Sequence, residues 1–262
     1  MLHDDIVKWI KTYANDNKIK TLVVWISGGI DSAVVSTLCA MTKLPTIAVS
    51  MPIAQLSEQH DLSMEHGSWL EQKFTNVTHE VIDLDKVYDT FWLKLFENYG
   101  SEHAFANTKS RLRMVTLHQI SGAKRGIVVG TGNKVEDFGV GFYTKYGDGG
   151  VDISPIADLM KSEVWQLGKD LGIMQEIINA PPTDGLWEDG RTDQDQLGGL
   201  TYEQMERAMD LDEKGAIAIG DDVELLNKYR QIRKLNLHKM EPIPVFKNDS
   251  TTQASDSKSW ST

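Results

Sequence analysis

The feature that most constrains this chain is the stretch at residues 23–32, which has the sequence VVWISGGIDS. Apolar and β-branched residues from Thr21 to Ile26 predict a buried strand, and the two adjacent glycines that follow predict a turn with room for close backbone approach. A helical pattern opens at Ile30, so a strand, a turn and a helix N-terminus follow one another directly. Because the first N–H groups of a helix lack internal partners, such a turn is suited to binding an anion such as phosphate.

The residues alone leave two interpretations of this turn open. It lacks the Gly-Lys-Ser/Thr sequence of a Walker-type P-loop. A carboxylate within a phosphate-binding turn repels its ligand unless a divalent cation bridges the two, which makes Asp31 a candidate Mg²⁺ ligand. In the other interpretation, Ser27 and Asp31 are ordinary turn and capping residues.

Strand-like and helical patterns alternate along the first half of the chain. Further strands are predicted at residues 46–50, 77–82 and 126–130, where β-branched and apolar residues cluster. From apolar positions three and four residues apart, helices are predicted at residues 4–16, 30–41, 57–73, about 87–95 and about 103–121. This alternation predicts an α/β fold, an open parallel sheet with helices on both faces and a ligand crevice at the carboxyl edge of the strands.

The second half of the chain differs in character. The glycine-rich segment 131–151 is predicted to be a loop that approaches a ligand closely, because so many glycines would weaken a helix or strand. The acidic segment 183–199 is predicted to be a mobile flap. The pattern also predicts a short strand and three helices, at residues 151–153, 161–171, about 201–210 and about 222–236. Residues 1–246 therefore form one predicted domain, followed by a polar tail at 247–262.

Composition excludes several classes of function. The formal net charge of −11 argues against nucleic acid as the main partner, because a phosphate backbone demands a basic surface. No apolar run approaches the roughly 20 residues that a membrane span requires. The N-terminus does not resemble a signal peptide, so a cytoplasmic protein without a membrane partner is expected. Cys39, the only cysteine, excludes internal disulfides and a CxxC site and is expected to be a buried structural thiol.

Two motifs resemble those of known enzyme families. The Ser-Gly-Gly-x-Asp-Ser sequence of residues 27–32 resembles the pyrophosphate motif of the ATP pyrophosphatases, which cleave ATP to AMP and pyrophosphate. The block Thr-Lys-Tyr-Gly-Asp-Gly-Gly at residues 144–150 is similar to that of ammonia-dependent NAD synthetases, and related ATP pyrophosphatases lack it. Further matches occur at Asp152, Pro155, Lys161, Pro182-Thr183, residues 200–202 and His238-Lys239, so the resemblance covers roughly residues 25–239. It implies a Rossmann-like fold of the adenine nucleotide alpha hydrolase type.

This resemblance implies a two-step amidation that uses free ammonia. The nicotinate carboxylate of deamido-NAD attacks the α-phosphorus of ATP, which gives an acyl-adenylate and pyrophosphate. Ammonia then displaces AMP and forms NAD. Adenylation is needed because a carboxylate is a poor acceptor for ammonia, whereas AMP is a good leaving group. The resemblance also implies Mg²⁺ as cofactor, ATP as co-substrate, and a homodimer whose dinucleotide lies across the subunit boundary, with the helix that contains Arg111 facing the partner.

The resemblance implies roles for individual residues. Those implied to bind ATP are Trp25, Ile26, Ser27, Gly28, Gly29, Ile30, Asp31, Ser32, Thr131, Lys161 and Thr183. The implied Mg²⁺ ligands are Asp31 and Glu136. Those implied to bind deamido-NAD are Arg111, Lys145, Asp152, His238 and Lys239. Lys161 is implied to neutralise phosphate charge during adenylation, and Asp148 to take a proton from ammonium, since NH₄⁺ cannot act as a nucleophile.

Each of these residues has a structural alternative. Lys145 and Arg111 are also typical of solvated surface charges. Asp148 is a favourable turn residue in any Gly-Asp-Gly-Gly sequence. Asp152 suits a capping or bridging role, and Glu136 suits the support of a nearby helix.

The chain departs from the family pattern in two places. Gly132-Asn133 stand where many bacterial members have Asp-His, and one extra residue lies between Glu136 and Lys145. The flap is also richer in acid and glycine than the family pattern, and no residue inside it beyond Thr183 is assigned.

Three other functions remain open. The same domain could receive ammonia from a separate glutaminase subunit. A tRNA-modifying ATP pyrophosphatase usually needs catalytic or cluster cysteines and a basic face, and this sequence has neither. A non-catalytic nucleotide-binding module is less compatible with two carboxylates placed for magnesium. Formation of AMP and NAD from ATP, deamido-NAD and ammonium, with glutamine tested in parallel, distinguishes these functions.

Overall fold

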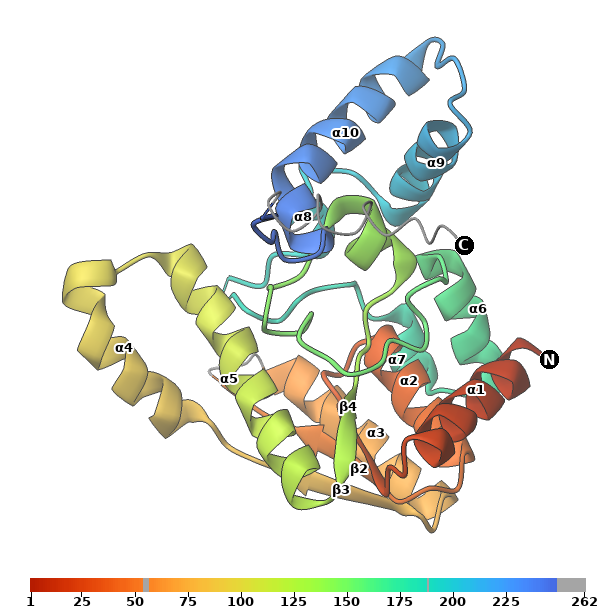
Figure 1. Ribbon diagram of the computed structural model, residues 1–262, viewed down its shortest axis with the longest axis vertical. Coiled ribbons are helices and arrows are strands. Elements are labelled where there is room, and N and C mark those ends of the chain that lie inside the picture. Colours follow the sequence, from red (N-terminus) through yellow and green to blue (C-terminus); the bar gives the residue numbers. More distant parts are fainter. Residues whose placement is uncertain (54–56, 188, 249–262) are drawn as a thin grey trace, which may run out of the picture.

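The structure is a computed structural model that describes residues 1–53, 57–187 and 189–248 (Figure 1). In the first half, the elements are α1 (Leu2–Asp16), β1 (Thr21–Trp25), α2 (Ile30–Met41), β2 (Thr46–Ser50), α3 (Ser57–Lys73), β3 (Val77–Val81), α4 (Asp85–Tyr99), α5 (Glu102–Ala123) and β4 (Gly126–Val129). In the second half, they are the π-helix η1 (Val135–Val140), α6 (Lys161–Leu171), α7 (Gln175–Asn179), α8 (Asp193–Gln196), α9 (Tyr202–Glu213) and α10 (Asp221–Met240). The predicted tail at 247–262 lies almost entirely outside the described residues.

The strands form a parallel sheet in the order β3-β2-β1-β4. Leu22 of β1 pairs with Thr46 of β2 on one side and with Ile127 of β4 on the other. The chain thus proceeds outward from β1 through β2 to β3, and then returns to place β4 on the opposite side of β1. Ligands bind at such a reversal of strand order, outside the carboxyl ends of the strands. The loops that leave β1 and β4 therefore meet where a ligand is expected.

Helices cover both faces of the sheet, which confirms the predicted α/β architecture. Leu22 and Val24 of β1 belong to the core that includes α1, α2 and α6. Val23, between them, joins Met114 and Leu117 of α5 in a core on the other face. Figure 1 shows α5 on one side of the strands and α1, α2 and α6 on the other. Strands β1, β2 and β4 are almost entirely buried, so their sequences are largely apolar, whereas the edge strand β3 is more polar and partly exposed.

A third group of buried residues joins η1 to the C-terminal helices. Val140 of η1 packs with Met205 of α9 and Tyr229 of α10. The guanidinium of Arg233 on α10 donates to the carbonyl oxygen of Gly139 at 2.7 Å. In Figure 1 these helices lie together at the top of the molecule. This packing fixes η1 beside the loops that leave the sheet.

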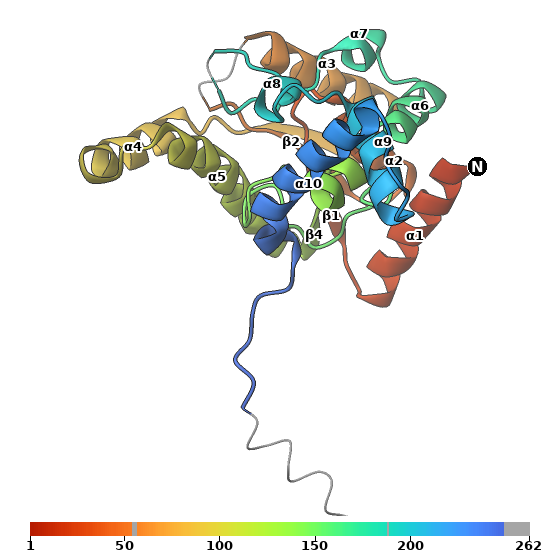
Figure 2. The same cartoon turned by 90° about the horizontal axis from the view of Figure 1, so that it is seen from above.

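Helix α4 and the start of α5 form an arm that projects from the body, whereas the rest of α5 packs against the sheet (Figures 1 and 2). In α4, all of which the structure describes, no residue is buried, and Leu93 and Tyr99 are 72% and 71% exposed. The rings of Trp92 and Phe96 contact Phe105 of α5. The arm therefore has its own small aromatic contact and leaves other apolar side chains in solvent.

Local predictions for the second half differ from the structure at several positions. The predicted strand at 151–153 is wrong, because Ile153 makes only an isolated bridge to Val129. The Asp152 carboxylate accepts the hydrogen bond of the Val128 N–H at 2.7 Å, a donor that a strand would pair with a backbone carbonyl. The segment 131–151 is not a loop throughout, since it contains η1. Helices α7 and α8 were not predicted, because five and four residues are too few to show a helical period.

Two other expectations concern Cys39 and the membrane. Cys39 is buried in α2, as predicted, and burial raises the pKa of its thiol above the ordinary value. Across the described ranges, the helices lack the combination of length and apolar sequence that spanning a membrane requires.

Candidate active site

The predicted strand, turn and helix N-terminus are present between β1 and α2. The Ser32 hydroxyl donates to the Gly29 carbonyl oxygen at 2.9 Å and accepts from the Ser27 N–H at 3.1 Å. The Gly29 N–H donates to Ser27 Oγ at 3.2 Å. These bonds fix the shape of the turn at the start of α2, where the helix dipole favours an anion.

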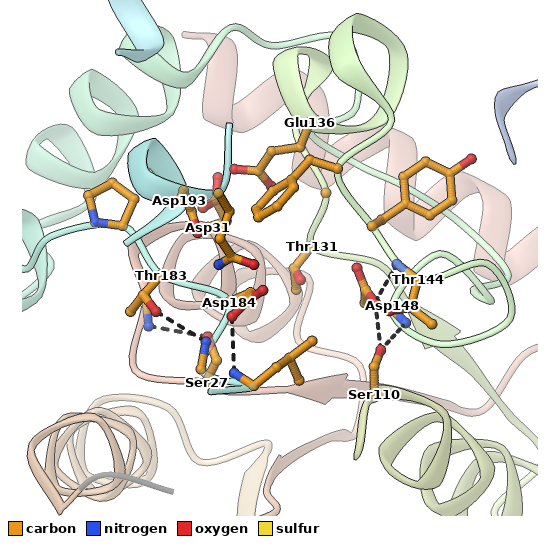
Figure 3. Close-up of a pocket in the computed structure, with 18 of the residues that line it drawn as sticks. Ser27, Asp31, Ser110, Thr131, Glu136, Thr144, Asp148, Thr183, Asp184 and Asp193 are labelled. Atoms are coloured by element: carbon orange, nitrogen blue, oxygen red, sulfur yellow. Dashed lines mark hydrogen bonds between the residues drawn. The ribbon is translucent and has the colours of Figure 1, made fainter. Parts of the chain in front are cut away.

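Lys161, the first residue of α6, joins two carboxylates from distant parts of the chain. Its Nζ lies 2.5 Å from Asp31 Oδ2 on α2 and 3.0 Å from Glu136 Oε1 on η1. The Lys161 side chain is 3% exposed. Burial alone would lower the pKa of Lys161, but the two carboxylates outweigh it and raise that pKa, so the ammonium stays charged. The two predicted metal ligands thus converge on one point, at the wall of a shared cavity (Figure 3).

Three residues that the sequence analysis did not assign complete this cluster. Asn133 is fully buried, donates through Nδ2 to Asp31 Oδ1 at 3.0 Å, and accepts through Oδ1 from the Glu136 N–H at 3.1 Å. The Tyr202 hydroxyl lies 2.6 Å from Glu136 Oε1 and 2.8 Å from Asp193 Oδ2. Burial raises the pKa of Asp193 to about 7, and the nearby carboxylate of Glu136 adds to the shift. Asn133 therefore orients the Asp31 carboxylate and fixes the backbone at Glu136, and Tyr202 links the Glu136 carboxylate to the flap.

Asp148 lies on another wall of the same cavity (Figure 3). Ser110 Oγ on α5 donates to Asp148 Oδ1 at 2.6 Å, and the Thr144 N–H donates to the same oxygen at 3.0 Å. A Cβ at Gly147 would lie 2.3 Å from Ser110 Oγ, so glycine is required there for the loop to reach α5. Burial raises the pKa of Asp148 despite these hydrogen bonds, which makes it a stronger base than an exposed aspartate.

Asp137 is a further acidic residue on the cavity wall, and no role was assigned to it from the sequence. Burial raises its pKa to about 8, with additional contributions from the carboxylates of Glu136, Asp148 and Asp31. Its two carboxylate oxygens would each lie 2.3 Å from a Cβ at Gly132, so only glycine leaves the space that the carboxylate occupies. Gly132 stands where many bacterial family members have aspartate. This departure was the sequence signal that could have drawn attention to Asp137, whose carboxylate occupies the space beside Gly132.

The basic residues implied to bind deamido-NAD gather where the end of α10 meets the loop after η1. Lys145 Nζ donates to the His238 carbonyl oxygen at 3.1 Å, and Lys239 Nζ donates to the Tyr143 carbonyl oxygen at 2.8 Å. Arg111 Nε on α5 donates to the Lys145 carbonyl oxygen at 3.3 Å. These contacts bring four positive or titratable groups, from three separate segments, to one end of the cavity.

The cavity has a volume of about 810 Å³ and lies between the loops after β1 and β4, α5, the block at 144–150, the flap and α10. Every residue assigned from the sequence lines it, apart from Ile26 and Asp152. Ile26 is buried and its N–H donates to the Val49 carbonyl oxygen at 3.0 Å. Asp152 is bonded to the backbone of β4. The structure therefore brings the assigned groups to one cavity and leaves these two beside it.

The flap covers one side of the cavity. The Thr183 hydroxyl donates to the Arg191 carbonyl oxygen at 3.2 Å. Lys109 Nζ on α5 donates to the Leu186 carbonyl oxygen at 3.2 Å, and the Arg191 guanidinium lies 4.0 Å from the ring centre of Trp187. These contacts tie the flap to itself and to α5, while its mobility stays a prediction.

The chain is similar to known proteins in both sequence and fold. The family model described as NAD synthase matches residues 2–243. A Finegoldia magna protein named NH(3)-dependent NAD(+) synthetase is 36% identical over 206 residues, or 78% of this chain and 82% of that protein. The structure of NMN synthetase from Francisella tularensis matches with a TM-score of 0.82 and 29% identity, covering 93% of this chain and 96% of that one. The NH3-dependent NAD synthetase from Campylobacter jejuni has the same fold, with a TM-score of 0.75 and 23% identity over 94% of this chain and 98% of that one.

Proposed function

This chain belongs to the NAD synthase family, and from that premise we propose that it is an ammonia-dependent NAD synthetase. It is then a ligase that uses ATP to convert the nicotinate carboxylate of deamido-NAD into the amide of NAD. The observation that most supports this activity is the position of Lys161 Nζ between Asp31 and Glu136, in the cavity that Asp148 also lines. Such a cavity offers charge compensation for a triphosphate and a base for ammonium in one enclosed space.

In the first step, the carboxylate of the substrate attacks the α-phosphorus of ATP. Residues 27–32 bind the phosphates through backbone N–H groups and the two serine hydroxyls, and the Lys161 ammonium neutralises charge that accumulates at the reacting phosphorus. Thr131, after β4, and Thr183, in the flap, supply further hydroxyl groups to the nucleotide. All of these groups lie at or above the carboxyl edge of the sheet, so ATP lies across the reversal of strand order.

Asp31 and Glu136 fit a divalent cation. Both already contact one positive charge, and carboxylate oxygens are the ligands that Mg²⁺ prefers. When bound, Mg²⁺ would neutralise the triphosphate and favour departure of pyrophosphate. The side-chain amide of Asn133 holds the Asp31 carboxylate and the backbone N–H of Glu136.

In the second step, ammonia attacks the carbonyl carbon of the acyl-adenylate and AMP leaves. Ammonium predominates at neutral pH, so a base must first take one of its protons. We assign this role to Asp148, since burial raises its pKa and since Ser110 and the Thr144 N–H hold its carboxylate in one orientation. The walls of the cavity limit hydrolysis of the acyl-adenylate by water.

Arg111, Lys145, His238 and Lys239 are proposed to bind the phosphates and riboses of deamido-NAD, because positive and hydrogen-bonding groups that gather at one end of a cavity suit an anionic dinucleotide. Asp152 and Ile26 are proposed to act indirectly, by fixing β4 and β1 beneath the site.

A homodimer is the proposed assembly, and residues 1–246 are proposed to form one domain of each subunit. Helix α5 presents Val115, which is 67% exposed, and the neighbouring arm leaves Leu93 and Tyr99 of α4 exposed. Apolar side chains on an exposed arm are typical of surfaces that a second subunit covers. Arg111 is one helical turn from Val115, so the proposed substrate-binding end of the cavity adjoins this surface.

A second candidate is amidation of nicotinate mononucleotide to NMN. The similarity to NMN synthetase from Francisella tularensis, with 29% identity over 93% of this chain, favours it specifically. The two substrates share the reacting carboxylate and differ only in the adenylate group that the dinucleotide carries. Glutamine-derived ammonia and tRNA modification remain the less favoured functions.

One assay tests these functions. Purified protein is incubated with ATP, MgCl₂ and ammonium chloride, with deamido-NAD, nicotinate mononucleotide or unmodified tRNA as acceptor, and AMP and the amide product are quantified. Deamido-NAD should give the highest kcat/KM, and glutamine should not replace ammonium. Higher kcat/KM with the mononucleotide would support the second candidate, and absence of AMP with every acceptor would reject both.

A further inference from the structure

We propose that helix α9 positions the Lys161 ammonium through two side chains one turn apart. Glu206 fixes the backbone beside Lys161, and Tyr202 holds the charged end of its side chain. The sequence pattern assigned neither residue a role in the reaction. The inference rests on the proposed function only in that Lys161 is the residue that neutralises charge at the reacting phosphorus.

Lys161 is at a position where its ammonium needs external support. A lysine carries its charge on a flexible four-carbon chain, so the ammonium keeps one position only if both the backbone and the charged end are held. Lys161 is also the first residue of α6, and the first N–H groups of a helix lack partners within the helix. The contacts made by this helix end therefore decide where the ammonium lies.

Glu206 holds the backbone at this end of α6. The Ser162 N–H donates to Glu206 Oε1 at 2.8 Å, and the Ser162 hydroxyl donates to Glu206 Oε2 at 2.8 Å. The Ser162 nitrogen and the Lys161 carbonyl carbon belong to one planar peptide unit, so this contact fixes the direction of the backbone at Lys161. A carboxylate at a helix N-terminus is favoured by the helix dipole as well. Glu206 thus ties the first turn of α6 to α9.

Tyr202 restrains the charged end of the same side chain. The centre of its ring lies 4.7 Å from Lys161 Nζ, within the range of a cation–π interaction. Its hydroxyl lies 2.6 Å from Glu136 Oε1, the oxygen that also lies 3.0 Å from Lys161 Nζ. The ring packs edge-on against Trp165 of α6, with ring centres 5.9 Å apart. Tyr202 therefore keeps the ammonium and its carboxylate partner together.

Helix α9 can set the spacing of this ion pair because it contacts both elements that carry it. It packs against η1, which carries Glu136, and against α6, which carries Lys161 (Figure 1). Tyr202 and Glu206 are four residues apart on α9 and thus share one face of the helix. Neither is among the described residues that line the cavity, so both act through Lys161 and are positioning residues.

The test measures how fast acetic anhydride modifies the Lys161 amine in the full chain without nucleotide, relative to the exposed Lys169 of the same helix. Mass spectrometry of the two peptides gives the ratio of the two rates. Glu206→Ala should raise this ratio at least fivefold, because the first turn of α6 loses two hydrogen bonds. Glu206→Gln keeps a side-chain oxygen for the Ser162 N–H and should stay within twofold of the parent. Glu203→Ala, which removes an exposed acid from α9, is the matched control and should also stay within twofold.

An unchanged ratio in a folded Glu206→Ala protein would overturn the proposal. A lower free energy of unfolding with that unchanged ratio would show that Glu206 supports only the packing of α9. Tyr202→Phe supplies a second variant, which keeps the ring and loses the hydroxyl bond to Glu136. Its ratio should rise at least threefold, and a ratio equal to that of the parent would overturn the role of Tyr202.

AMP formation from ATP, MgCl₂, deamido-NAD and ammonium chloride provides a second readout. Glu206→Ala should lower kcat at least fivefold and leave KM for ATP within twofold, because the turn at residues 27–32 stays in place, and Glu206→Gln should restore kcat. An undiminished kcat in Glu206→Ala would overturn the positioning role in the reaction. Because the labelling needs no substrate, a protein that shows the expected ratios but forms no AMP would count against the proposed function alone.

Discussion

Lys161 Nζ lies 2.5 Å from Asp31 Oδ2, although 130 positions separate the two residues in the chain. Asp31 is in the first turn of α2, directly after the turn that leaves β1, and Lys161 is the first residue of α6. The two helices pack against one another in the core that covers one face of the sheet. The ion pair is therefore set by helix packing, which holds it more firmly than a loop would.

Lys161→Met is expected to destabilise the protein by about 3 kcal/mol at neutral pH, because it leaves two buried carboxylates without their cation. Urea unfolding measures this free energy. Lys169→Met, at an exposed position of the same helix, should change it by less than about 0.5 kcal/mol. Millimolar Mg²⁺ should restore more stability to Lys161→Met than to the parent, because both carboxylates can then bind it. Equal responses of the two proteins to Mg²⁺ would contradict a cation site at Asp31 and Glu136.

Asp31→Asn tests the proposed cation site through its effect on pyrophosphate release. The amide has a similar size and keeps an oxygen for the Asn133 donor, so the fold should persist while a negative cation ligand is lost. Pyrophosphate release with ATP, deamido-NAD and ammonium is expected to fall about a thousandfold. Asp158→Asn, whose side chain is 98% exposed, controls for the change in charge. If circular dichroism is unchanged and turnover stays within tenfold of the parent, Asp31 does not serve the cation.

The sequence pattern predicted the strand, turn and helix that carry the candidate phosphate-binding turn, because residues close in the chain form all three. Residues 21–41 form a strand, a turn and a helix in direct succession, and each step has a sequence signal. Thr131 follows β4 as Ser27 follows β1, and the two meet because parallel strands present their carboxyl ends at one edge. The π-helix η1 lies in the segment for which one extra residue is predicted, and that insertion stays a prediction.

The rest of the site depends on contacts between distant segments. Asp193 lies in an acidic stretch that is typical of solvated surface, yet it is buried and bonded to Tyr202, a contact that no local pattern indicates. No sequence pattern near Asn133 indicates its hydrogen bond to Asp31, which lies 102 positions away in the chain. Asp152 matched the family pattern, yet its carboxylate accepts a hydrogen bond from the Val128 N–H of β4, next to the isolated bridge between Val129 and Ile153.

Ser110→Ala should separate the two steps of the reaction. Ser110 donates to Asp148 at 2.6 Å and thereby lowers the pKa of a carboxyl that burial raises. Without this bond the Asp148 pKa rises further, so the acid limb of the pH profile for NAD formation should move to higher pH, and the rate at low ammonium should fall about tenfold. Exchange of labelled pyrophosphate into ATP should stay within twofold of the parent. Ser121→Ala, which removes another buried hydroxyl from α5, should affect neither measurement. A parallel loss in both half-reactions would show that Ser110 supports the loop alone.

Stability should fall in mild acid because of His66. This side chain is 1% exposed on α3, its Nε2 pairs with Ser36 Oγ at 2.9 Å, and burial, with a contribution from His79, lowers its pKa to about 4. The unfolded chain has the ordinary histidine pKa of about 6.5 and thus binds the proton more tightly than the folded protein. The contribution of neutral His66 to the free energy of unfolding is therefore fully present above pH 6.5, and it is lost as the pH falls from 6.5 toward 4.

Between pH 7.5 and 5 this loss should amount to about 2 kcal/mol of the free energy of unfolding. His66→Gln keeps a hydrogen-bonding partner for Ser36 and should reduce the difference between the two pH values by that amount, as measured by urea unfolding. His118→Gln, at an exposed histidine, should retain the pH dependence of the parent. If His66→Gln retains it as well, His66 does not stay neutral in the folded protein.

Val115→Glu is expected to dissociate the proposed homodimer. Val115 is 67% exposed on α5, one turn from Arg111, and a two-fold boundary there would place two introduced carboxylates near one another in a desolvated region. Sedimentation at micromolar concentration should change from dimer to monomer, and kcat/KM for deamido-NAD should fall at least tenfold if the dinucleotide needs both subunits. Ile217→Glu places the same charge on a residue that is 91% exposed in the connection between α9 and α10, and should remain dimeric and active. A parent protein that sediments as a monomer with full activity would show that the cavity of one subunit is sufficient, and the exposed arm would then need another explanation.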